Sequence, residues 1–179
     1  MICVTWTSPF PAEPPTLPIT DGPITGDERP ILLGMLARQR SCLLNVCAGL
    51  TAEQLAERPL PPSTLSLLGL VRHLAKVERV WLRQRIAGED VAPLYGGPGD
   101  DSDFDDADPA HAERDVATFV AELPLADAAL ASAPLDHEID FRGRAMSVRA
   151  VLAHMHTEYA RHLGHADMLR ERVDGVTGR

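Results

Sequence analysis

The sequence has little lysine and a deficit of positive charge. Lys76 is the single lysine among 17 basic residues, and these face 26 acidic residues, so the formal net charge is −9. A protein that follows a phosphate backbone needs the opposite balance, because its affinity comes largely from Lys and Arg side chains that displace counterions. We therefore expect no nucleic-acid partner.

Long apolar runs are missing, and cysteines are few. No window approaches the ~20 uninterrupted apolar residues of a membrane span, and the N-terminus has neither the basic region nor the apolar stretch of a signal peptide. Cys3, Cys42 and Cys47 do not suffice for a disulfide framework in a chain of 179 residues, and their spacing is not that of a CxxC pair. We expect no membrane partner, a reducing cytoplasm as the compartment, and Cys42 and Cys47 as small buried hydrophobes.

What remains predicts one globular domain behind an extended leader. Apolar residues make up 45% of the chain, which is enough for an ordinary core. Residues 1–26 contain repeated prolines, which remove backbone donors and disfavour helix. We expect this leader to lie over the surface or to be disordered, and residues 27–179 to form the domain. A leader that crosses onto a second copy is one route to a homodimer, which stays open at this stage.

Four long segments show helical spacing of apolar residues. The first begins near Thr25 or Asp27, where Thr25 and Glu28 have capping-box spacing, and it stops at Gly49. The others are expected over residues 63–87, 108–132 and 148–173, and Pro124 should kink or break the third. A short helical turn at 51–57 and a small hairpin or wide turn at 136–145 complete the pattern. These segments predict an all-α four-helix bundle.

An acidic run at residues 100–106 separates the second and third long segments. It superficially resembles a calcium loop, but the sixth position from Asp101 is Asp106 where Gly is required, and the twelfth is Ala112 where Glu is required. A solvated acidic loop is the better interpretation. A position near the mouth of a cleft is compatible with it.

Histidines gather on the last helix. His154, Glu158, His162 and His165 fall on one side of it at about 100° per residue, whereas His156 points the other way and is expected at the surface. Glu158 and His162, spaced i and i+4, can reach one ion. Such pairs are also common on solvated helix faces, so this pair alone does not decide between the two interpretations.

His73 shifts the balance towards a metal site. It lies inside the apolar stripe of the second long helix, between Leu70 and Val77. A single such histidine is usually a hydrogen-bonded core residue, but here a second helix brings Glu158 and His162 towards the same interior, as in metal sites of helix bundles. Two imidazoles and one carboxylate leave a coordination position open, and these donors suit zinc or another late first-row divalent ion such as nickel.

At this point the chain resembles the DinB-like superfamily of four-helix bundles, in the actinobacterial branch near mycothiol-dependent maleylpyruvate isomerase. The resemblance covers residues 27–175 and is carried by SLLGLVRHLAKVERVW (66–81), DDSDFDDAD (100–108) and SVRAVLAHMHTEYARHLGHADMLRERVDG (147–175). It implies a divalent metal on His73, Glu158 and His162. His154 is then a reserve ligand, and His165 lies near the site.

The resemblance also implies a reaction. Relatives include S-transferases and an isomerase that use a low-molecular-weight thiol such as mycothiol, and a coordinating thiol is held as the nucleophilic thiolate. Hydrolysis is a less favoured variant. The alternative is a non-enzymatic, stress-related or structural bundle, since fold alone does not establish function. Arg72, Arg79 and Arg161 are candidates for binding an anionic substrate, although ion-paired or solvated arginine is the commoner case.

Overall fold

A computed structural model describes residues 6–9, 22–97 and 99–177. Most of the predicted leader (1–5 and 10–21), Cys3 included, lies outside these residues, so the division into leader and domain stays a prediction. In the described part, Thr7 and Thr51 form one antiparallel bridge, and the backbone N–H of Ser8 donates to the carbonyl of Leu50. Residues 6–9 therefore lie against the bundle.

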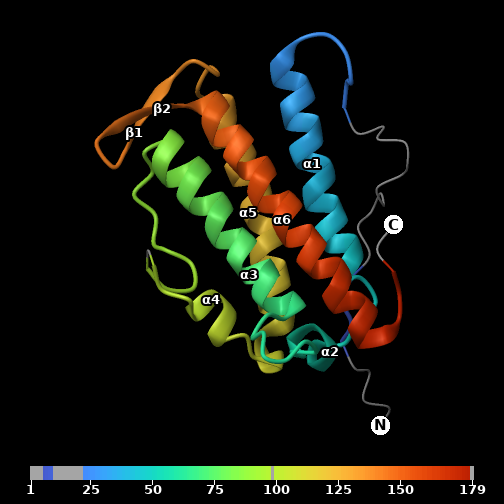
Figure 1. The fold of residues 1–179 in the computed structure, drawn as a ribbon. Coiled ribbons are helices and arrows are strands. Elements are labelled where there is room, and N and C mark those ends of the chain that lie inside the picture. Colours follow the sequence, from blue (N-terminus) through green and yellow to red (C-terminus); the bar gives the residue numbers. More distant parts are fainter. Residues whose placement is uncertain (1–5, 10–21, 98, 178–179) are drawn as a thin grey trace.

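Four long helices form the bundle (Figure 1). They are α1 (Glu28–Cys47), α3 (Leu67–Glu78), α5 (Ala112–Ala131) and α6 (Val148–Asp174), and α3 continues without a break into the π-helical segment η1 (Arg79–Ile86). Helix α1 packs against α6, and α3 packs against both α5 and α6. The predicted all-α bundle is confirmed.

Short elements connect the long helices. They are α2 (Ala52–Ala56), α4 (Ser102–Asp105), the 3-10 turn η2 (Pro109–His111) and the strands β1 (Glu138–Phe141) and β2 (Arg144–Ser147). The strands are antiparallel, with Glu138 opposite Ser147, so of the two expected alternatives the segment forms the hairpin and not the wide turn. Arg142 and Gly143 join them with φ of 57° and 77°, as a tight two-residue turn requires.

Capping residues set the helix boundaries that position the site. The Ser66 side chain accepts a hydrogen bond from the Gly69 N–H at the start of α3, and Ser147 does the same for Ala150 at the start of α6. Gly175 ends α6 in the left-handed conformation. The capping box expected at Thr25 is wrong, because Asp27 is the N-cap residue of α1 and makes no side-chain cap bond.

Of the kink or break expected at Pro124, the break is wrong, since α5 runs through the proline. Pro124 is exposed, and so is Val120, whose carbonyl loses its i+4 partner and is left on the water side of the helix. On the opposite side, Phe119 and Ala126 are buried on either side of the proline. Their packing keeps both halves of α5 helical, which outweighs the loss of one backbone hydrogen bond.

The core lies between the four long helices. Cys47 is buried, as expected, whereas Cys42 is only partly buried and Met35 of α1 is 44% exposed. Within the described part of the chain, no helix is both long and apolar enough for a membrane crossing. Fully buried large side chains come from every long helix, including Leu36, Leu43, Leu70, Leu74, Phe119, Leu130 and Tyr159.

Candidate metal centre

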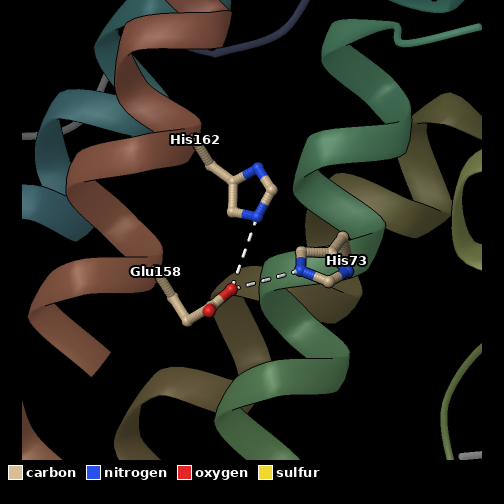
Figure 2. Close-up of side chains that lie close together, drawn as sticks. All are labelled: His73, Glu158 and His162. Carbon is tan, nitrogen blue, oxygen red and sulfur yellow. Dashed lines mark ion pairs between the residues drawn. The ribbon is translucent and has the colours of Figure 1, made fainter. Parts of the chain in front are cut away.

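His73, Glu158 and His162 converge between α3 and α6 (Figure 2). Each offers one ligand atom, and the three atoms lie within 4.8 Å of one another. Glu158 Oε2 lies 3.7 Å from His73 Nε2 and 3.4 Å from His162 Nε2. The i,i+4 spacing stacks Glu158 and His162 on one face of α6, and the contact between α3 and α6 brings His73 opposite them.

The donor set fits a small divalent ion. Zinc with nitrogen or oxygen ligands at 2.0–2.1 Å needs its tetrahedral ligands roughly 3.3 Å apart, close to two of the separations found here. His73 Nε2 is shielded from solvent and has no hydrogen-bond partner among the described residues. A buried nitrogen without a partner is rare and needs an explanation. A metal ion at this point would complete the set, with a further coordination position left open.

Asp103 holds the ring of His73 from the other side. His73 Nδ1 donates to Asp103 Oδ2 at 2.7 Å, and this bond turns Nε2 towards Glu158. Burial by itself would raise the pKa of Asp103, but the hydrogen bond and charge of His73, with the Lys76 ammonium, hold that pKa below its usual value. A carboxylate behind a ligating histidine is the typical outer support of a zinc site.

The solvated loop expected at 100–106 is therefore wrong at its centre. Asp103 is buried, and Phe104 stacks on the His73 ring with centroids 4.7 Å apart. Arg72 fastens α4 to α3, because its guanidinium donates to the carbonyls of Ser102 and Asp103 at 2.8 Å. Gly69 permits this close packing, since a Cβ there would lie 3.2 Å from the Phe104 ring.

His162 is held in its neutral form. Burial lowers its pKa to about 4, and the repulsion from His73 adds to the effect, although the Glu158 carboxylate opposes it. At neutral pH its imidazole therefore keeps a free lone pair, which a metal ligand requires. Its Nδ1 is buried and has no hydrogen-bond partner in the part of the chain that the structure describes.

The other histidines of α6 lie around this group. His154 Nε2 is 3.9 Å from Glu158 Oε1, and its ring packs on Trp81 at 4.4 Å. The ring of His165 lies 5.4 Å from that of His162. His156, expected at the surface, is half-buried and bonded through Nδ1 to Gln39 Oε1 at 2.8 Å, because α1 packs against this side of α6.

Two of the three candidate arginines are ion-paired within the bundle. Arg72 pairs with buried Asp115 at 2.8 Å, and Arg79 pairs with Glu122 at 2.6 Å. Arg161 is exposed on α6. The ion-paired interpretation is confirmed for Arg72 and Arg79, so neither offers an unpaired charge to a substrate.

A pocket of about 400 Å³ opens beside His73 and runs along α3 and η1. The residues that line it include Val77, Val80, Trp81 and Arg85. Sequence reasoning missed this pocket and Asp103, because both depend on how the segment after η1 folds back over α3.

Comparison with known families agrees with this architecture. The model of the mycothiol-S-transferase family matches residues 31–175, which include all three converging side chains. The chain belongs to this family. The family is DinB-like, so the resemblance seen in the sequence is confirmed. No curated protein and no solved structure gives a significant match to the chain.

Proposed function

We propose that this protein is a metal-dependent S-transferase that uses a low-molecular-weight thiol such as mycothiol. The observation that carries the proposal is the convergence of His73, Glu158 and His162 beside an open pocket, in a member of a mycothiol-S-transferase family. Zinc is the favoured ion, and nickel is the alternative. Thiol-dependent isomerisation is the second candidate reaction, since it would need the same site.

The metal would supply one property, namely a low pKa for a coordinated thiol, which is then held as thiolate. The chain supplies the rest. Glu158 brings the negative charge that offsets the ion, neutral His162 offers a lone pair, and Asp103 orients His73. Cys47 is no substitute nucleophile, because it is fully buried and burial raises its pKa to about 12.

The test is thiol transfer to 1-chloro-2,4-dinitrobenzene with mycothiol as the thiol, followed by absorbance. We expect turnover that a chelator abolishes and added zinc restores. His73→Ala should be inactive with or without zinc, and the matched variant His154→Ala should remain active. A rate of thiol transfer that neither the chelator nor His73→Ala changes would contradict the proposal.

Absence of both bound metal and thiol transfer would favour the non-enzymatic bundle instead.

The homodimer is a separate prediction. Light scattering on the full chain should give twice the mass of one chain of 19.4 kDa, and a monomer mass would dismiss it.

A further inference from the structure

Arg85 differs from the other arginines of η1 in having no acidic partner. Arg79 and Arg83 both bind Glu122, and Arg83 also binds Glu89. Arg85 makes no ion pair or hydrogen bond to any residue that the structure describes, and its Nε is shielded from solvent. A shielded guanidinium nitrogen without an acceptor is costly, which points to an acceptor supplied from outside the chain.

Aromatic rings hold this guanidinium in place without neutralising it. Its central carbon lies 4.9 Å from the centre of the Trp81 ring and 5.0 Å from that of Phe141. Such cation–π contacts orient an arginine while leaving its N–H groups available. Trp81 sits one turn before Arg85 on η1, and Phe141 comes from the end of β1, so the hairpin and η1 together fix the position.

The pocket beside the metal centre presents this charge against apolar walls. Arg85 and His73 both line it, with Val77, Val80 and Trp81 between them, and none of its described lining residues is acidic. Lys76 also lines the pocket, but its ammonium is engaged by Asp103 Oδ1 and by the carbonyls of Tyr95 and Asp100. Arg85 is therefore the unneutralised cation of the pocket among the described residues.

We propose that this pocket binds the second substrate of the transfer, an apolar and preferably aromatic electrophile that carries a carboxylate. Arg85 would take the carboxylate, Trp81 and the two valines would contact the ring, and the reacting carbon would lie at the His73 end. This inference rests on the proposed function. In the transfer, the thiolate sulfur forms the new C–S bond, the leaving group departs with its bonding electrons, and the thiol proton passes to solvent.

Helix geometry limits the length of such a molecule. His73 and Arg85 are twelve positions apart on one continuous helix, so their Cα atoms are separated by at most about 18 Å. Helical side chains lean towards the N-terminus, so the Arg85 head reaches back towards His73. The remaining gap suits a single substituted ring, and the pocket volume of about 400 Å³ is large enough for one.

The test compares two probes of the same shape that differ in charge, 4-nitrobenzoate and 4-nitrobenzamide. Their Kd values for the full chain are measured by quenching of tryptophan fluorescence, since nitroaromatic rings quench Trp81 on contact. We expect the benzoate to bind about tenfold more tightly, as one charge-assisted hydrogen-bond pair allows. Arg85→Met should abolish this ratio and leave the Kd of the amide unchanged, which also shows that the variant is folded. Arg85→Lys should keep part of the ratio.

Two further variants serve as controls. Arg142 also lies over the Phe141 ring, at 5.2 Å from its centre, but it is exposed and does not line the pocket, so Arg142→Met should keep the full ratio. His73→Ala should keep it as well, which separates a carboxylate on Arg85 from a carboxylate on a metal.

The proposal is overturned if the wild type binds both probes equally or binds neither. It is also overturned if Arg85→Met keeps the ratio or if His73→Ala loses it. Failure of the proposed function has a different signature, because loss of the zinc and thiol dependence of turnover would leave the ratio of the two Kd values unchanged.

Discussion

Two neighbouring residues of α6 belong to two different polar clusters, one fully hydrogen-bonded and one not. Tyr159 belongs to a paired cluster with Arg40 and Glu78, and Glu158 belongs to an open cluster with His73 and His162. In the paired cluster, Glu78 accepts three hydrogen bonds of 2.7 Å, two from Arg40 and one from Tyr159. In the open cluster, the ligand atoms stay 3.4 Å or more apart.

The comparison distinguishes a polar cluster that stabilises the fold from one that is suited to bind a ligand. Both clusters bridge α3 and α6, and both contain a carboxylate. The paired cluster is complete without anything from outside, so it links α1, α3 and α6 as part of the fold. The open cluster leaves a shielded nitrogen on His73 without a partner. An incomplete buried group of this kind is where a ligand is expected.

The largest effect should come from breaking the paired cluster. Glu78→Ala removes the bidentate partner of the buried Arg40 guanidinium and leaves it only the exposed carboxylate of Asp127, and breaking a buried pair typically costs about 3–5 kcal/mol. Urea unfolding should show this loss in the free energy of unfolding. Glu28→Ala, which removes one exposed partner of Arg149, is the matched control and should change little. Comparable losses in both variants would refute the distinction.

The next effect tests the support of the open cluster. Asp103→Asn keeps the shape behind His73 but removes the charge, so zinc should bind about 10- to 100-fold more weakly in a competition titration. Asp105→Asn changes an exposed carboxylate of the same helical turn and should bind zinc like the wild type. Equal zinc affinity in all three proteins would remove Asp103 from the site.

A smaller effect is expected for Glu158→Gln in metal-free protein. Glu158 makes no hydrogen bond of ordinary length to the two histidines, so this change should alter the free energy of unfolding by less than about 1 kcal/mol. With zinc present, the wild type should gain stability and the variant should not. A large loss in the metal-free variant would mean that Glu158 is structural, as Glu78 is.

The smallest effect concerns Cys47, which is buried at the end of α1. Burial raises the pKa of the Cys47 thiol to about 12, so little thiolate forms at pH 8 and alkylation by iodoacetamide should be slow. Because the reactive form grows as pH approaches that pKa, the rate should still be rising above pH 9. Peptide mass spectrometry reports the modified site. Rapid labelling of Cys47 at pH 8 would contradict its burial.

The sequence was sufficient where the signal is local. The helical spacing of apolar residues located α3 and α6, and the spacing of Glu158 and His162 with the apolar setting of His73 predicted the convergence of these three residues. That these residues bind a metal stays a proposal.

Long-range packing decided the rest. Nothing local distinguishes Asp103 from the other aspartates of its run; the one hint is the adjacent Phe104, an aromatic residue amid acids. The break predicted at Pro124 was wrong because the general rule that proline disrupts a helix does not consider whether the proline lies on the exposed face. The role proposed for Arg85 could not be predicted from the sequence, because it depends on the contact with Phe141 at the end of β1.

The most direct test of the central claim is metal content by elemental analysis of untagged protein incubated with zinc. The account predicts about one zinc ion per chain in the wild type and in His154→Ala, and none in Glu158→Ala or His73→Ala. Equal zinc in the wild type and Glu158→Ala, or none in the wild type, would contradict it.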